Sequence, residues 1–360
     1  MLTLNLNAPM NLAGTLDLEH GGNRSDPLTS QWDVDLQFAQ ASVDFGIRLE
    51  NVHGGVRLVG GFDGEHVRSR GELSVDSLHW KNLQFTQVLG PLWIDDDQVL
   101  FGSHVDRQRQ GQSQGGAAAP QPRPRPLTAQ LLGGTVSGDA WVSLQSEPRY
   151  GLQATLVQGD LARFAKENSA GGQGLRGSIA ATVNLRGAGR TVNGLGGHGT
   201  IQLRDADIYE LPLMIRLLKI LSIRRPDPTA FSTADIRYRI EGNHVYFDRI
   251  DFSGDAVSLL GQGDMDFQTA IHLCFHAQVG RGRIQIPLLQ EVLGGASQQI
   301  MLIYVGGTLQ DPEVSRKAFP GVNRALQQFQ GDLEKTANQG LFPQARQWGA
   351  NGERRLPRKE

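Results

Sequence analysis

The stretch AIHLCFHAQV, residues 270–279, alternates apolar and polar side chains without a break. Its apolar members are Ile271, Leu273, Phe275, Ala277 and Val279. Successive side chains of a β-strand point to opposite faces of a sheet, whereas a helix would need apolar residues every three or four positions. The stretch therefore predicts a strand with one apolar and one polar face.

The same alternation recurs along most of the chain. It is present in QWDVDLQF (31–38), SVDFGIRLE (42–50), YGLQATL (150–156) and SIAATVNL (178–185). Turn signals such as VHGG, GFDGE and EGNH separate the runs. Gly accounts for 45 of 360 residues, well above the usual ~7%. Together these features predict a mainly β protein of consecutive antiparallel strands with a few short helices, one of them at GDLARFAKE with Asp160 as its N-cap.

A segment rich in Gln, Gly, Pro and Arg, VDRQRQGQSQGGAAAPQPRPRP, interrupts the alternation. Such a composition predicts a disordered linker, which either joins two sheet segments or is inserted between strands of one sheet. Helical spacing of apolar residues predicts an amphipathic helix near the C-terminus. The expected organisation is a β-sheet repeat region at 1–104, the linker at 105–126, a β-groove domain at 127–320, the amphipathic helix at 321–342 and a disordered tail at 343–360.

The composition limits which kinds of molecule the protein is expected to bind. With 35 Lys and Arg against 37 Asp and Glu, the chain has no basic excess for binding nucleic acid. The lone Cys274 excludes an intrachain disulfide. No run of ~18 apolar residues is present to span a membrane, and the N-terminus carries no leader or anchor pattern. Because Leu2, Leu4 and Leu6 already alternate, we expect the sequence to begin inside a sheet, as a fragment would.

Three motifs resemble chemical sites. GLGGHG, residues 194–199, precedes a strand instead of a helix, so we interpret it as a glycine-rich hairpin turn and not as a dinucleotide fingerprint. In HLCFH, His272, Cys274 and His276 share one face, but ~7 Å spacing is wide for tetrahedral zinc, which favours the solvent-facing side of a strand. DDD, residues 95–97, lacks calcium-loop spacing and is predicted to be a turn. We therefore expect no catalysis, metal or cofactor.

The most apolar stretch of the chain is ELPLMIRLLKILSI, residues 210–223. As a helix of ~13 residues it would be ~20 Å long, too short for a ~30 Å hydrocarbon core. It could plug the end of the sheet as ordinary core, or contact a membrane surface with Arg216 and Lys219 as a narrow polar stripe. The residues proposed for this plug or membrane-contact helix are Leu213, Ile215, Arg216, Leu217, Leu218, Lys219 and Leu221.

An alternating sheet must hide its apolar face against a second sheet, helices or an apolar ligand. Helices are too few here, which leaves a sandwich, a barrel or a groove. A groove would suit acyl chains, because each methylene removed from water gains ~0.8 kcal/mol. The candidate lining residues are Tyr150, Leu152, Leu156, Ile179, Val183, Leu185, Ile236, Tyr238, Ile240, Val257, Leu259, Ile271, Leu273 and Phe275.

An ordered set of motifs downstream of the linker resembles the C-terminal region of AsmA-like proteins. The set comprises the GGTVSG turn, strands ending in L-x-G-x-G, the apolar helix, the GQGDMDF strand and the closing VGGTLQDP. The resemblance covers residues 127–320.

The resemblance implies a long curved antiparallel β-sheet that forms an apolar groove, taco-like or like an open barrel. It also implies a periplasmic location, anchored in the inner membrane through a segment that this chain does not contain. Relatives are implicated in phospholipid transport and outer-membrane assembly, and the family has no catalytic residues to carry over. We therefore expect a non-enzymatic cell-envelope protein that binds or conducts phospholipid between the two membranes, with envelope proteins as partners at the groove ends. An assembly or scaffold factor for outer-membrane β-proteins is the alternative.

Overall fold

The structure is a computed structural model of the chain. It describes residues 5–7, 9–20, 27–44, 48–105, 124–167, 175–189, 191–207, 213–214, 216–217, 231–254, 257–279 and 300–317. All of them belong to one compact unit, Met1–Lys317. The predicted amphipathic helix and tail, and residues 106–123 of the predicted linker, lie outside the described residues.

The described residues form a single antiparallel sheet of 18 strands, which confirms the predicted mainly β class. The strands are β1 (Asn5–Asn7), β2 (Met10–His20), β3 (Leu28–Asp44), β4 (Arg48–Phe62), β5 (Val67–Trp80), β6 (Leu83–Asp95), β7 (Gln98–Phe101), β8 (Leu127–Leu131), β9 (Gly134–Ser143), β10 (Arg149–Asp160), β11 (Ser178–Ala188), β12 (Gly196–Arg204), β13 (Thr233–Glu241), β14 (His244–Ser253), β15 (Val257–Asp266), β16 (Ile271–Val279), β17 (Ile300–Gly307) and β18 (Pro312–Lys317). Helical segments are α2 (Leu161–Glu167), the 3-10 turn η1 (Val192–Gly194), and the described helical residues 103–105, 213–214 and 216–217.

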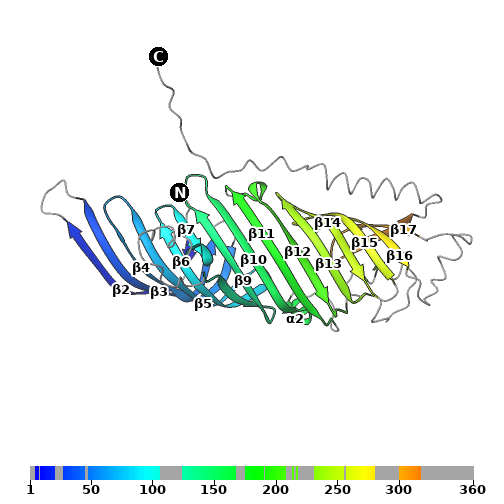
Figure 1. Cartoon of the computed structure of the whole chain (residues 1–360), viewed down its shortest axis with the longest axis horizontal. Helices are drawn as coiled ribbons and strands as arrows, with labels where there is room; N and C mark the ends of the chain where they lie inside the picture. The colour runs from blue at the N-terminus through cyan, green and yellow to red at the C-terminus, as the bar shows by residue number, and fades with distance from the viewer. Residues whose placement is uncertain are drawn as a thin grey trace, which may run out of the picture. The chain divides into compact units, whose positions relative to one another are not determined.

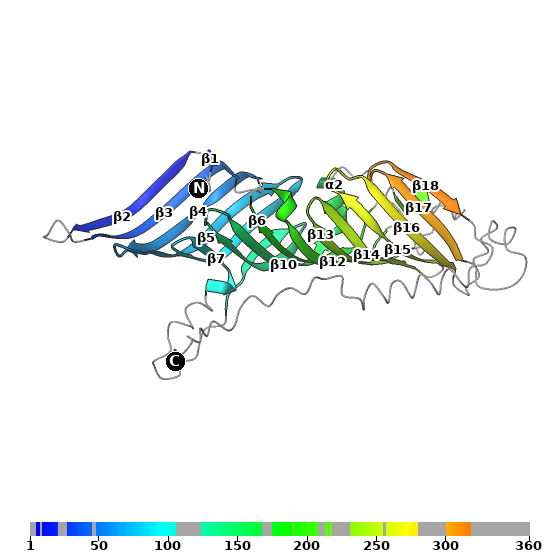
Figure 2. The same cartoon turned by 90° about the horizontal axis from the view of Figure 1, so that it is seen from above.

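The strands follow one another across the sheet in chain order, as the colours of Figure 1 show. From β9 to β18 each strand pairs with the next, and the same holds from β2 to β6. Figure 2 displays β2 and β18 at opposite ends of this series. Within the described residues, β2 pairs only with β3 and β18 only with β17.

The two halves of the sheet join at β7 and β8. Both strands lie between β6 and β9 and pair with each of them. Residues 106–123 therefore connect two strands of one sheet. Of the two alternatives for the predicted linker, the insertion between strands of one sheet is the one that the pairing supports.

β-bulges adjust the alternation where it would otherwise turn apolar residues outward. Gln40 adopts a left-handed φ of 54°, and the β3–β4 register shifts between Phe38 and Ala41. The extra residue moves the apolar positions from even to odd numbers, so that Ala41 is fully buried. The prediction of one continuous strand over 42–50 is wrong, because β3 ends at Asp44, β4 begins at Arg48, and Val43 pairs with Leu49.

The strand register shows which residues of neighbouring strands share one side of the sheet, here called the apolar face. Directly paired residues lie on the same face of an antiparallel sheet. One unbroken row from β10 to β17 is Leu156, Ala181, Ile201, Ile236, Ile250, Gly261, Phe275 and Ile303. A second row, from β2 to β11, is Leu16, Trp32, Gly60, Ser69, Ile94, Val99, Val142, Tyr150 and Gly187. The opposite side is called the polar face.

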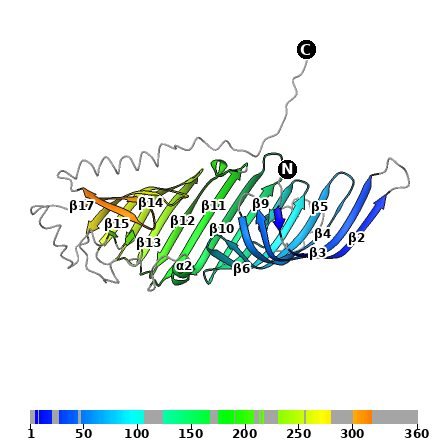
Figure 3. The ribbon, with the colours of Figure 1, turned by 180° about the vertical axis from the view of Figure 1, so that it is seen from behind.

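The main hydrophobic core lies on the apolar face of β12–β17. The sheet contributes residues such as Leu259, Phe275 and Ile303, all fully buried. They are covered by Leu161 and Ala165 of α2 and by four further residues: Leu175, Met214, Leu217 and Phe231. The α2 segment follows β10 directly, beneath the sheet in Figure 3. The backbone N–H of Ala162 donates to Asp160 Oδ1 at 2.8 Å, which confirms the predicted N-cap.

Among the described residues, no helix combines the length and apolar character required to cross a bilayer.

Candidate functional site

The register places all fourteen residues predicted to line a groove on the apolar face. Leu152 pairs with Leu185, and Ala154 with Val183. Farther along, Tyr238 pairs with Phe247, and Met265 with Ile271. Val257 pairs with Val279 in the same phase as Leu259 and Ala277. Residues chosen from separate stretches of sequence therefore form one continuous surface over β10–β16.

Glycines opposite aromatic residues make room for the rings on this face. Tyr150, Tyr238 and Phe275 each lie beside a glycine on the neighbouring strand: Gly187, Gly199 and Gly261. A Cβ at Gly199 would come within 2.4 Å of the Tyr238 hydroxyl, so the ring occupies the space of the missing side chain. Tyr238 also donates from its hydroxyl to the Thr182 carbonyl at 3.2 Å, which fixes the ring across β12. The abundance of glycine thus has a structural reason on this face.

Exposure of the apolar face is greatest at the β2 end of the sheet and least at the opposite end. At the β2 end, Leu12 is 69% and Leu16 60% exposed. In the middle, Leu152 is 36% exposed, and at the far end Phe275 is fully buried. A second, smaller core covers part of β3–β6 and consists of Ala41, Val52 and Val75. The apolar face is therefore exposed chiefly on β2, partly buried in the middle of the sheet and covered over β12–β17.

The described helical residues 213–214 and 216–217 take part in that cover. Met214 and Leu217 are fully buried within the main core, and Leu213 is half-buried against it. Arg216 is exposed and forms an ion pair with Asp311 in the β17–β18 turn. This placement favours the plug over the membrane-contact interpretation. The other predicted members of the helix, Ile215, Leu218, Lys219 and Leu221, lie outside the described residues.

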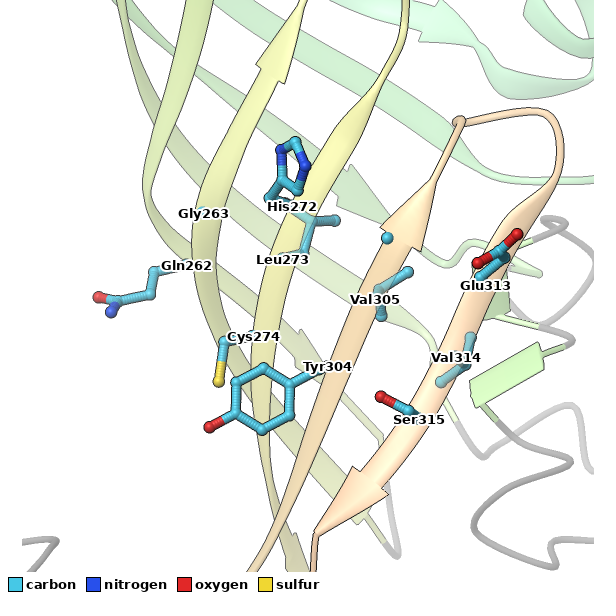
Figure 4. Close-up of a pocket in the computed structure, with 11 residues that line it drawn as sticks. Gln262, Gly263, His272, Leu273, Cys274, Tyr304, Val305, Glu313, Val314 and Ser315 are labelled. Atoms are coloured by element: carbon cyan, nitrogen blue, oxygen red, sulfur yellow. The ribbon is translucent and has the colours of Figure 1, made fainter.

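The polar face carries the HLCFH residues beside a hollow of 580 Å³ at the β15–β18 end (Figure 4). Gln262, Cys274, Tyr304 and Ser315 form one cross-strand row along it. The sequence predicts that this face of the strand is exposed to solvent. The prediction is correct for His272, which is exposed, and wrong for His276, which is buried. Burial raises the pKa of the Cys274 thiol, and burial lowers the pKa of His276 against an opposing backbone hydrogen bond at Leu260. A protonated thiol is a poor metal ligand and a poor nucleophile.

The other two motifs are structural. Asp96 and Asp97 form the β6–β7 turn, with Asp96 left-handed at φ 50°, which confirms the predicted turn at 95–97. In GLGGHG, Gly194 belongs to η1, whereas Gly196, Gly197 and Gly199 lie in β12 and not in the predicted turn. Gly197 and Gly199 accept neighbouring side chains, those of Leu185 and Tyr238. Within the described residues, no three His, Cys, Asp or Glu side chains gather as a metal site would require.

Alternation in QWDVDLQF also predicts Trp32, Val34, Leu36 and Phe38 as lining residues, and the register places these four on the apolar face. The apolar face continues from them through Leu58, Leu92 and Ile94. Alternation was the available signal for each strand. It could not identify the shared face, because bulges at Gln40, Asn51 and Gln87 break the phase between strands.

Comparisons with protein-family models, with curated proteins and with solved structures find no match.

Proposed function

We propose that this chain belongs to a non-enzymatic cell-envelope protein that binds phospholipid acyl chains along the apolar face and conducts them between inner and outer membrane. The observation that carries the proposal is the apolar face itself, continuous in register across the sheet, exposed on β2 and partly exposed toward the middle of the sheet. The resemblance of residues 127–320 to AsmA-like proteins points the same way.

Energetics favour an apolar ligand on this face. Soluble monomers rarely expose contiguous apolar patches larger than a few hundred Å². A chain of ~16 methylenes gains roughly 13 kcal/mol on leaving water, and the leucines that it covers gain as well. Because the hydrophobic effect has no direction, the bound chain can slide along the face.

In this proposal the sheet curls around the acyl chains as a groove, and headgroups remain in water at its rim. The covered end over β12–β17 closes the groove, and the Met214–Leu217 helix is its plug. The protein works in the periplasm, attached to the inner membrane, with envelope proteins as partners at its ends.

The test is to purify the whole chain from a bacterial host and to count bound phospholipids by native mass spectrometry. We expect more than one phospholipid per chain. Leu152→Asp puts a charge on the apolar face, where burial against acyl chains costs several kcal/mol, and should reduce bound lipid at least about tenfold. Val157→Asp is the matched control, because Val157 is similarly exposed at 47% but lies on the polar face.

A folded wild-type chain without lipid, or equal loss in both variants, would contradict the proposal. The second candidate would then be favoured: an assembly factor that offers a sheet edge to outer-membrane β-proteins. The specific observation for it is β2, whose eleven residues are all exposed and whose outer edge has no partner within the described residues. Such an edge can accept an added strand.

A further inference from the structure

The outer edge of β2 offers backbone groups in a defined pattern. Within the described residues, β2 lies at one end of the sheet (Figure 2) and pairs only with β3, without a register shift. The Ala39 N–H donates to the Pro9 carbonyl at 3.4 Å, and the residue pairs of an antiparallel ladder alternate between hydrogen-bonded and non-hydrogen-bonded ones. The odd-numbered residues of β2 therefore point their backbone groups toward β3. The outward N–H and C=O groups belong to the even-numbered residues Met10, Leu12, Gly14, Leu16, Leu18 and His20.

The same even-numbered residues carry exposed side chains on the apolar face. Leu12, Leu16 and Leu18 are 69%, 60% and 63% exposed. A strand added to this edge forms its main-chain hydrogen bonds with the even-numbered residues of β2, and its directly paired side chains lie on the apolar face. The edge therefore favours an incoming strand with an apolar side chain at every second position.

The polar face of this edge is acidic. Asp17 and Glu19 of β2 are exposed, and the described part of the chain provides neither with an ion pair. Asp33 and Asp35 follow on the same face of β3. Neither strand contains Lys or Arg, and their one histidine, His20, belongs to the apolar face. The polar positions of an incoming strand would thus lie beside carboxylates.

Nearby arginines do not neutralise these carboxylates. Arg57 of β4 forms an ion pair with Asp33 at 2.9 Å and lies opposite Asp35 in the register. Arg68 and Arg70 lie on β5, three strands or about 14 Å from β2, farther than the ~10 Å screening length at 0.1 M salt. Arg68 already pairs with two other carboxylates. Four carboxylates on β2 and β3 against Arg57 leave three net negative charges at this edge.

We propose that the β2 edge binds an extended segment of a partner protein in which apolar residues alternate with lysine or arginine. The inference rests on the strand-accepting edge of the second candidate function and specifies its partner. The apolar residues of the segment lie beside the exposed leucines, and its basic residues lie beside Asp17 and Glu19. Opposite charges on directly paired residues stabilise a sheet, whereas like charges destabilise it. A second copy of β2 would bring further carboxylates to the same seam, so charge disfavours self-pairing.

The experiment titrates the whole chain into three fluorescent peptides, each as long as β2, and measures their anisotropy. All three carry Val at every second position, with Lys, Thr or Glu between. We expect the Lys peptide to bind with a dissociation constant of about 1–100 µM, about three- to thirtyfold more tightly than the Thr peptide. The Glu peptide should bind more weakly still. High salt should reduce the differences, because it screens exposed charges.

Two pairs of variants locate the contact. Asp17→Asn combined with Glu19→Gln should remove most of the preference for Lys over Thr. Asp76→Asn combined with Glu147→Gln is the matched control, because it removes the same two kinds of charge at exposed positions away from β2, and it should retain the preference. Leu16→Pro removes one outward N–H, which an edge strand tolerates. It should weaken binding of the Lys and Thr peptides about fivefold or more relative to Leu16→Ala, which keeps that N–H.

Four results would overturn the inference. Equal affinity for the three peptides removes the charge preference but leaves the strand-accepting edge, whereas a folded wild-type chain that binds no peptide contradicts the second candidate function as well. Lys-peptide binding that is unchanged in Leu16→Pro identifies electrostatic adsorption, and a dimer in sedimentation that excludes the peptides assigns the edge to a second copy. Melting temperatures within a few degrees of wild type verify that the variants are folded. Leu152→Asp should leave peptide binding unchanged, so this edge is tested independently of lipid binding on the apolar face.

Discussion

Single glycines decide how closely aromatic rings lie on the apolar face. A Cβ at Gly261 would be 2.4 Å from Phe275 Cδ1, and one at Gly187 would be 2.2 Å from Tyr150 Cζ. The two rings differ in how far they can move, because Phe275 is fully buried and Tyr150 is only half-buried. Identical substitutions should therefore have different consequences.

We predict that Gly261→Ala lowers the free energy of unfolding by about 1–3 kcal/mol, because Phe275 has no space to move. Gly187→Ala should cost less, since Tyr150 can swing toward solvent. Gly306→Ala is the control: its nearest neighbour would be 4.0 Å from the new Cβ, and replacing a strand glycine is slightly favourable. Urea unfolding measures all three. Equal losses at Gly261 and Gly306 would show that the aromatic contacts are unimportant.

At the scale of elements, a hydrogen-bonded cluster joins the β4–β5 and β6–β7 turns. His66 Nδ1 lies 2.7 Å from Asp96 Oδ2, and the Val67 N–H donates to Asp96 Oδ1 at 2.8 Å. The Asp96 hydrogen bond raises the pKa of His66. The Val67 N–H, then His66, lower the pKa of Asp96. Two hairpins are thus coupled through one titratable pair.

This pair predicts a pH window for stability. The His66 contribution is fully present below its unfolded pKa of ~6.5 and is lost as pH rises through the raised folded value. The Asp96 contribution is present above ~3.9 and is lost as pH falls through the lowered one. His66→Gln should therefore flatten the decline in urea midpoint above pH 6.5. His198→Gln, exposed on β12, should retain it, and an unchanged decline in His66→Gln would refute the assignment.

Individual strands could be predicted from the sequence where the alternation of apolar and polar residues was clear within one short stretch. Alternation identifies strands such as β10, β11 and β16, because the two faces differ within five or six residues. The bulges had little such signal, since only Asn51 of the three bulge residues Gln40, Asn51 and Gln87 is of a type that favours a left-handed φ. The end of β3 at Asp44 was missed for a related reason: Val43 and Leu49 belong to different strands and pair with each other.

At the scale of the whole sheet, each strand depends almost entirely on its two neighbours. Within the described ranges no strand closes this meander, so stability should vary along its length as in repeat proteins. The main core adds contacts only over β12–β17. Whether the apolar face is covered could not be predicted from strand patterns, because the cover comes from residues as distant in sequence as Leu161, Leu217 and Phe231.

We predict a gradient of amide hydrogen exchange. Strands β14–β17 should exchange slowest and β2 fastest, with β10 between them. Leu217→Asp places a charge in the core and should accelerate exchange in β14–β17 while leaving β4 and β5 unchanged. Exchange coupled to mass spectrometry resolves these segments. A uniform rate across the sheet, or acceleration everywhere in the variant, would instead mean one cooperative unit.

The junction at β7 and β8 makes the chain suitable for carrying a reporter. Because both strands are held between β6 and β9, the register of the two halves does not depend on the length of the segment that joins them. Doubling the length of a flexible loop costs only ~0.6 kcal/mol. A fluorescent domain inserted among residues 106–123 would thus label the protein in living cells while both of its ends stay untagged.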